Sequence, residues 1–356
     1  MKKIFFFSLL SLSLLLITAT AANAKTSGAW NPSVPDGYSP ISWVSGHGIQ
    51  SFMKAPQGNG TIDYLTLVYL PDNLVNFISS SSAPLDWGPA AAPFAGTTAV
   101  QDWAVARLTT EAAKASAPDA KFIWNAPFFN ENLATTNLSL ALKTTSASGT
   151  VFITSGSRPN TDMAKERRTL TVDNAEGTAT IGDFDAAAFS TTSTDDQAVE
   201  GFAPDILKTD GNGTAASRLF LGVADDGKEL VIYCSQEATP DEASQALAAA
   251  GVATSSQMQA DGGGSATCGY NLPGQYFVEP DRTLPYLMGA FPLVERGAVT
   301  VDILNVRSGP GTKFDKVNRL QKDDAVIAYA EKNGWLKISN YQDEWVSADY
   351  IKNLTP

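Results

Sequence analysis

The spacing of apolar and polar residues along the chain predicts many short strands. Apolar residues that alternate with polar ones, or that form short runs between turn residues, are typical of strands. A hairpin is expected where the turn 224–227, with Asp-Gly at its tip, separates two apolar runs. The predicted strands of the first 290 residues cover 61–70, 122–124, 151–154, 169–172, 178–184, 219–223, 230–234 and 256–260.

Two helices are predicted from capping residues. Thr98 with Gln101 forms a capping-box pattern ahead of an apolar face, and Thr239 with Glu242 forms a second one before a helix that ends near Gly251. This second helix lies between two predicted strands and leads to a run of glycines at the end of the next strand. Taken together, these elements predict an α+β fold, a mixed β-sheet domain with flanking helices.

Composition changes near residues 293–298, and the pattern after it consists of short strands. They cover 304–306, 317–320, 325–330, 335–338 and 344–347, with Gly-, Pro- and Asn-rich turns between them. Such closely spaced strands predict a small all-β barrel.

The first 24 residues have the pattern of a cleaved secretory signal. Lys2 and Lys3 precede an apolar run over 4–17, and residues 22–24 (Ala-Asn-Ala) form a small-x-small cleavage site. The run is shorter than the roughly 20 residues of a membrane-spanning helix. We therefore expect a secreted or periplasmic protein without stable membrane insertion, with residues 25–60 forming an irregular N-terminal segment.

Charge and rare residues exclude several classes of function. The 356 residues carry a formal charge of -12, so no basic surface for nucleic acid is expected. One histidine, His47, and two cysteines, Cys234 and Cys268, leave too few ligands for most zinc, haem or iron–sulfur sites. We expect no metal and no cofactor, and His47 to be a loop or core residue. In an oxidising compartment Cys234 and Cys268 could form a disulfide, the alternative being two buried thiols.

The C-terminal pattern resembles a bacterial SH3-type domain over residues 298–354. The resemblance rests on 304–311, 333–338, 344–346 and 350–351. It implies tethering to the cell wall, to a peptide or to another domain. Trp335, Trp345 and Tyr350 could line a peptide or glycan groove, but packing within the barrel is the favoured explanation for the two tryptophans.

The most informative stretch is Asp261–Thr267, which contains three consecutive glycines. Glycines allow a sharp turn whose N–H groups surround an anion such as phosphate. No Lys-Ser/Thr follows, and the glycines lack the spacing of a dinucleotide-binding loop. A flexible surface loop is the alternative.

Four segments in order resemble the phosphodiester glycosidase family, to which the lysosomal uncovering enzyme (N-acetylglucosamine-1-phosphodiester alpha-N-acetylglucosaminidase) belongs. They are 125–129, 198–208, Arg218 with 219–223, and 261–267 followed by Arg282. The resemblance covers residues 61–293. Three of these segments depart from the family pattern, which bears on the choice of substrate and on activity.

The resemblance implies hydrolysis of a sugar-1-phosphodiester, of N-acetylhexosamine type, to free sugar and a phosphomonoester. Asp261 would be the catalytic carboxylate and Glu200 the second one. Phosphate and sugar would be held by the remaining candidates, which are Arg218, Arg282, Asn125, Gly262, Gly263, Gly264, Ser265 and Thr267. The alternative is a non-catalytic envelope protein that binds a cell-wall glycan or phosphodiester and is anchored through its SH3-like domain.

Overall fold

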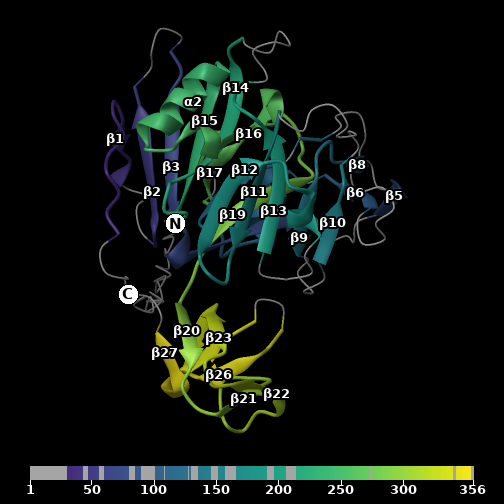
Figure 1. Cartoon of the computed structure of the whole chain (residues 1–356), viewed down its shortest axis with the longest axis vertical. Coiled ribbons are helices and arrows are strands. Elements are labelled where there is room, and N and C mark those ends of the chain that lie inside the picture. The colour runs from purple at the N-terminus through teal and green to yellow at the C-terminus, as the bar shows by residue number, and fades with distance from the viewer. Residues whose placement is uncertain are drawn as a thin grey trace, which may run out of the picture.

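A computed structural model of the protein gives two large sheets and a smaller C-terminal body (Figure 1). The residues that it describes are 30–42, 47–55, 60–79, 85–89, 101–107, 109–126, 128–129, 135–145, 151–156, 166–190, 196–205, 214–272, 275–339 and 342–353. The expected signal, residues 1–24, lies outside the described residues. None of the helices in the described part is long and apolar enough to cross a membrane.

The fold is mostly β, so the expected α+β class fits only loosely. Across the described ranges the α-helices are α1 (Thr110–Ser116) and α2 (Pro240–Ala249). Helix α2 has the predicted start, because the Thr239 hydroxyl accepts from the main-chain N–H of Glu242 and the Glu242 carboxylate accepts from that of Thr239.

The larger sheet has the order β1-β2-β3-β15-β14-β16-β13-β9-β10-β6-β5, with β11 and β12 beside β13 and β8 beside β6. Its strands are β1 (Ser39–Pro40), β2 (Ile49–Lys54), β3 (Asp63–Tyr69), β5 (Leu85–Pro89), β6 (Gln101–Ala106), β8 (Thr135–Asn137), β9 (Leu142–Thr145), β10 (Val151–Thr154), β11 (Arg167–Asp173), β12 (Thr178–Asp183), β13 (Asp196–Phe202), β14 (Ala216–Val223), β15 (Glu229–Ala238) and β16 (Gln257–Gly262).

The second sheet has the order β18-β17-β7-β19-β4 and packs face to face on the first. Its strands are β4 (Asn73–Ser79), β7 (Phe122–Asn125), β17 (Cys268–Tyr270), β18 (Tyr276–Val278) and β19 (Tyr286–Pro292). The main core lies between the sheets, where Leu219 and Ile232 of the first share a cluster with Trp124 and Met288 of the second. Helix α2 covers the other face of the first sheet, and α1 covers the other face of the second.

Two sequence-based expectations of secondary structure were wrong. The helix predicted from Thr98 is replaced by β6, which pairs with β5, with β8 and, at Gln101, with β10. Pairing with distant strands overrides a local capping signal of this kind. The helix nearby is α1, which is capped instead by Thr109. Residues 25–60 are also not irregular throughout, because β2 pairs with β3 along its whole length.

The C-terminal body contains the predicted short strands around a small core of its own. The core includes Val306, Leu336 and Val346. The strands are β20 (Glu295–Val299), β21 (Ile303–Arg307), β22 (Lys316–Gln321), β23 (Ala325–Ala328), β24 (Ala330–Lys332), β25 (Trp335–Lys337), β26 (Trp345–Ser347) and β27 (Ile351–Asn353).

Arg296 joins the two bodies. It lies on β20, and its side chain, 7% exposed, reaches into the larger domain. Its Nε donates to the Pro71 carbonyl (3.1 Å), Nη1 to that of Ala175 (2.9 Å) and Nη2 to that of Leu70 (3.0 Å). A buried guanidinium that satisfies several main-chain carbonyls fixes the position of the C-terminal body against the larger domain.

Candidate functional site

A bulge in β16 decides where Asp261 points. Leu219 of β14 pairs with Asp261, but the next residue, Phe220, pairs with Gln259, so Ala260 is an extra residue. A bulge of this kind re-aims the side chains that follow it. Asp261 therefore points to the side of Leu219, between the two sheets, whereas regular alternation would put Asp261 on the same face as Gln259.

Asn125, the last residue of β7 in the second sheet, holds the Asp261 side chain. Its Nδ2 donates a hydrogen bond to Oδ2 of Asp261. Its Oδ1 accepts from the main-chain N–H of Thr267 (2.9 Å), and its own N–H donates to the Thr267 carbonyl (3.1 Å). The Thr267 hydroxyl donates to the carbonyl of Val278 (2.7 Å). Asn125 and Thr267 thus position the carboxylate of Asp261.

The surroundings of Asp261 raise the pKa of its carboxyl above the usual value. The residue is 1% exposed, and this burial raises the pKa of Asp261 to about 6. Hydrogen bonds from Ser265, from the main chain of Gly262 and from Asn125 lower its pKa, as does the charge of Arg282, but burial outweighs them. A carboxyl with a pKa near neutral can exchange a proton with a reacting group.

The glycine loop follows Asp261 directly. Gly262 ends β16, and Gly263–Ser265 form a 3-10 turn. Gly263 has a φ of +75°, which a side chain would strain, and the space beside its Cα is open. Gly264 has no such space, because the carboxylate of Asp281 lies where its Cβ would be.

Asp281 was not identified from the sequence. Its N–H donates to the Gly264 carbonyl (2.9 Å), and its Oδ1 accepts from Nε of Arg282 (2.7 Å). The bond to Arg282 is the main reason that the pKa of Asp281 is below its usual value. The adjacent Asp-Arg pair was visible in the sequence, but its packing against a loop 17 residues away was not.

Arg218 lies on the other side of the sheet from Asp261. It precedes Leu219 on β14, so its side chain points toward the α2 face, and it donates to the carbonyls of Ala238 (3.2 Å) and Thr214 (2.8 Å). Its Nη1 comes close to Gly262, whose Cβ, if present, would lie 2.9 Å away. The main chain of Gly262 therefore separates the Arg218 guanidinium from the Asp261 carboxylate.

Glu200 is not brought together with Asp261. It lies on β13 with the same alternation as Ala198, which packs outside the main core, whereas Val199 faces into it. Its Oε1 accepts from Nη1 of Arg167 (2.6 Å) and its Oε2 from the N–H of Ala141 (2.7 Å). Burial raises the pKa of Glu200, and Arg167 lowers it. These contacts make a buried ion pair on the opposite face of the sheet, not a second carboxylate beside Asp261.

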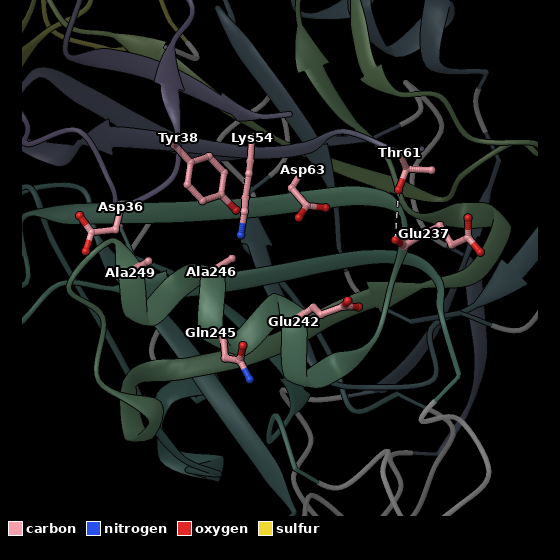
Figure 2. A pocket seen from close by; sticks show the side chains of 10 residues that line it. All are labelled: Asp36, Tyr38, Lys54, Thr61, Asp63, Glu237, Glu242, Gln245, Ala246 and Ala249. Atoms are coloured by element: carbon pink, nitrogen blue, oxygen red, sulfur yellow. Dashed lines mark hydrogen bonds between the residues drawn. The ribbon is translucent and has the colours of Figure 1, made fainter. Parts of the chain in front are cut away.

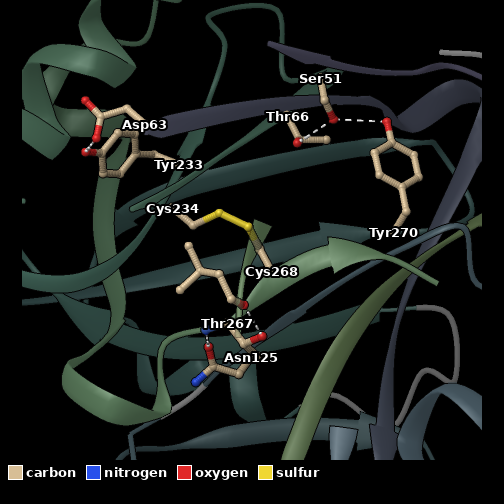
Figure 3. The surroundings of a disulfide bond; sticks show 10 residues. Ser51, Asp63, Thr66, Asn125, Tyr233, Cys234, Thr267, Cys268 and Tyr270 are labelled. Atoms are coloured by element: carbon tan, nitrogen blue, oxygen red, sulfur yellow. Dashed lines mark hydrogen bonds between the residues drawn. A yellow bond between two sulfur atoms is a disulfide. The ribbon is translucent and has the colours of Figure 1, made fainter. Parts of the chain in front are cut away.

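A disulfide joins the two sheets next to this site. Cys234 of β15 and Cys268 of β17 are bonded, with their Cα atoms 6.5 Å apart (Figure 3). Cys268 follows Thr267, so the bond fixes the strand that begins after the glycine loop. Further along β17, the Tyr270 hydroxyl is hydrogen-bonded to that of Ser51 in β2 (3.0 Å).

Two of the three aromatic candidates of the C-terminal body, Trp335 and Trp345, lie on the same face of its sheet. Trp335 pairs with Ser347, and Lys337 with Trp345, so the two tryptophans are diagonal neighbours on one face of β25–β26. Leu336 and Val346 point the other way, into the core. Trp345 is 8% exposed and Tyr350 45%. Trp345 is thus mainly a packing residue.

The remaining sequence candidates show little sign of a metal or base. His47 is an exposed loop residue with a φ of +55°, and its carbonyl accepts from Nδ2 of Asn73 (2.8 Å). Within the described ranges, no group of three His, Cys, Asp or Glu residues could hold a metal ion.

Residues 302–352 match the sequence profile of the bacterial SH3 domain. The C-terminal body is a bacterial SH3 domain. This match covers less than half of the chain, and no curated protein matches the chain.

Two solved structures are similar to the chain at low levels. One is a hypothetical protein from Synechocystis, with a TM-score of 0.38 and 12% identity over 72% of this chain; the chain spans 64% of that protein's length. The other is the zebrafish N-acetylglucosamine-1-phosphodiester alpha-N-acetylglucosaminidase catalytic domain, auto-inhibited by its pro-peptide. Its TM-score is 0.43, with 12% identity over 69% of this chain and 84% of that one.

Proposed function

We propose that the larger domain, about residues 61–293, is an exported hydrolase that cleaves a sugar-1-phosphodiester. The observation that carries the proposal is the buried Asp261 carboxyl, with a pKa of about 6, directly before the glycine loop. The phosphodiester glycosidase-like motifs, which include Asp261–Thr267 and Arg282, support the substrate class, with an N-acetylhexosamine as the sugar.

The proposed reaction breaks the bond between sugar C1 and the phosphate oxygen. A water oxygen bonds to C1, the electron pair of the broken bond leaves with the phosphomonoester, and Asp261 accepts a proton from the water. Near neutral pH most of Asp261 is ionised, since its pKa is about 6, so the carboxylate can act as the base. A phosphomonoester is a good leaving group, which reduces the need for a second carboxylate as general acid. This agrees with the separation of Glu200 from Asp261.

The phosphate would bind at the glycine loop. The open space beside Gly263 leaves room for an anion against the main chain, and Arg282 supplies a positive charge whose effect reaches Asp261. Asp281 accepts a hydrogen bond from Arg282, and we propose that Arg282 turns from it to the phosphate. Arg218 is on the other side of Gly262, where it donates to the carbonyls of Ala238 and Thr214, so we do not propose it as a ligand of the phosphate.

The test is release of free N-acetylglucosamine from an alkyl or aryl phosphodiester of N-acetylglucosamine-1-phosphate. We expect Asp261→Asn to abolish release while the far-UV circular dichroism stays unchanged. The matched control is Asp225→Asn, in the exposed turn between β14 and β15, which should retain full activity. No release by the unaltered protein, or equal release by Asp261→Asn, would refute the proposal.

A second candidate is a non-catalytic envelope protein that binds a glycan or phosphodiester. The enclosure of Asp261 by Asn125, Ser265 and Gly262 favours it, because the carboxyl is 1% exposed and its bond to Asn125 also serves to hold the two sheets together. The SH3 domain would attach the protein to peptidoglycan or a peptide in either case. Binding of the diester without turnover would support this candidate over the hydrolase.

Pull-down with purified peptidoglycan tests the attachment. Trp335 is the half-buried tryptophan of β25, so Trp335→Ala should weaken retention without unfolding the domain. Retention that is absent in the unaltered protein, or unchanged in Trp335→Ala, would contradict a glycan groove at this face.

A further inference from the structure

A pocket of about 270 Å³ lies on the opposite face of the larger sheet from Asp261, beside helix α2. It is formed where β2, β3 and β15 end or begin, and by one side of the helix (Figure 2). Its lining residues are Asp36, Tyr38, Lys54, Thr61, Asp63, Glu237, Glu242, Gln245, Ala246 and Ala249. The size is just below the roughly 300 Å³ at which pockets for larger ligands begin, so a small molecule is the appropriate occupant.

The hydroxyl of Tyr38 is the feature that suggests a ligand for this pocket. The Tyr38 side chain is 7% exposed, and none of the described residues hydrogen-bonds its hydroxyl. Burial, together with the charge of Asp63, raises the pKa of Tyr38, so the hydroxyl keeps its proton. Figure 2 shows the ring extending toward α2 with the hydroxyl at its end. A buried hydroxyl without a partner is costly, and a ligand atom in the pocket would satisfy it.

The charges around the hydroxyl favour a cation. Four carboxylates line the pocket, at Asp36, Asp63, Glu237 and Glu242, against one ammonium, that of Lys54. Two of the carboxylates are held in place by the protein. Asp63 accepts from the hydroxyl of Tyr233 (2.9 Å), and Glu242 accepts from the N–H of Thr239 (2.7 Å). Carboxylates that are already oriented lose little freedom when they bind a ligand.

Lys54 adds a hydrogen-bond donor beside these four carboxylates. It pairs with Asp63 across β2 and β3, and its Nζ lies 5.9 Å from the centre of the Tyr38 ring. A ligand that carries an oxygen atom beside its cationic group can therefore accept a bond from Lys54 while the carboxylates take the cation. The small side chains of Ala246 and Ala249 leave the space that such a ligand needs.

We propose that this pocket binds a primary ammonium group on a small polar molecule with an adjacent hydroxyl or carbonyl oxygen. Amino sugars with a free amine and amides of basic amino acids share this chemistry. The site does not depend on the hydrolase activity proposed above. It takes a cation, in contrast to the phosphate proposed for the glycine loop.

Calorimetric titration of the full-length mature protein with D-glucosamine and with L-lysinamide tests the site and separates the two sources. D-Glucose and glucose-6-phosphate are the neutral and anionic controls. We expect millimolar binding of at least one amine, no binding of either control, and affinity that falls as salt is added. Binding of glucose equal to that of glucosamine, or no binding of either amine, would overturn the proposal.

Three variants assign the binding to this pocket. Tyr38→Phe removes only the hydroxyl and should weaken amine binding about three- to tenfold. Asp36→Asn should weaken it by a similar factor, with Asp225→Asn as the control that removes a distant exposed carboxylate. Ala249→Phe should block the pocket, whereas Ala248→Phe places the same side chain on the neighbouring exposed position of α2 and should bind normally. Unchanged binding in both Tyr38→Phe and Ala249→Phe would show that the amine binds elsewhere.

Discussion

Asn125 and Asp261 belong to different sheets, yet the amide of Asn125 donates directly to the carboxylate of Asp261. The same amide accepts from Thr267, one residue before the cysteine that forms the disulfide. One side chain thus couples the candidate catalytic carboxylate to the strand that leaves the glycine loop. Changes at this contact are expected to affect both stability and activity.

The pKa of Asp261 makes stability depend on pH in a defined direction. A carboxyl with a pKa of about 6 in the folded state, and near 3.8 when unfolded, binds more protons folded than unfolded between these values. Its contribution to stability is therefore full below pH 3.8 and is lost as pH rises through 6, a loss of about 3 kcal/mol.

Asp261→Asn carries no charge and should lack this loss. The free energy of unfolding of both proteins can be measured in urea from pH 4 to pH 8. As pH rises, the variant should become more stable relative to the unaltered protein. A difference that stays constant over this range would mean that Asp261 has an ordinary pKa.

Asp281 is expected to compete with a bound anion. Its carboxylate holds Arg282 and occupies the space at Gly264. Because its side chain is 65% exposed, removing the charge should have a modest effect, with phosphate bound about two- to fivefold more tightly by Asp281→Ala. Arg282→Gln should weaken phosphate binding. Titration calorimetry with inorganic phosphate measures both, and tighter binding by Asp225→Ala to the same extent would point to net charge as the cause.

The disulfide is expected to contribute strongly to stability. Cys234 and Cys268 are 34 residues apart in the chain, and both are buried. Closing a loop of this length constrains the unfolded chain by about 4 kcal/mol in the entropy model. The double variant Cys234→Ala/Cys268→Ala should lose roughly this amount in denaturant unfolding. A loss well below 1 kcal/mol would show that packing between the sheets suffices without the bond.

Arg296 is expected to stabilise the contact between the SH3 domain and the larger domain. Arg296→Met keeps much of the side-chain volume but removes the donors to the carbonyls of Leu70, Pro71 and Ala175. We expect a loss on the order of 3–5 kcal/mol and faster proteolysis near residues 293–295. Arg319→Met, at an exposed position of β22, is the matched control. Equal behaviour of the two variants would mean that Arg296 does not hold the domains together.

Local signals in the sequence predicted the elements whose structure depends on neighbouring residues. The start of α2 at Thr239, the hairpin of β14 and β15 and the SH3 strands are of this kind. The helix expected from Thr98 failed because β6 gains partners on both sides from distant segments. Capping residues indicate only local structure, so they do not reveal pairing with segments far along the chain.

The candidate site could be predicted only in part for a similar reason. The glycine loop and Asp261 were evident as a motif, but the bulge at Ala260 that turns Asp261 inward depends on the pairing of β14 with β16. The side of the sheet occupied by Glu200 follows from its place on β13, and its partner Arg167 lies 33 residues earlier. Which face a side chain occupies is set by strand register, which a single sequence does not specify.

The junction at Arg296 has a consequence for how the proposed hydrolase would work at a surface. Two residues separate β19 from β20. The Arg296 guanidinium is hydrogen-bonded to carbonyls of the larger domain, so it restricts movement between the two domains. A long linker would let a catalytic unit sweep a wide zone around its anchor. Here the attached SH3 domain would fix the orientation of the catalytic unit. The arrangement of the cell-wall polymer around each attachment point would then determine which of its bonds can reach the candidate site.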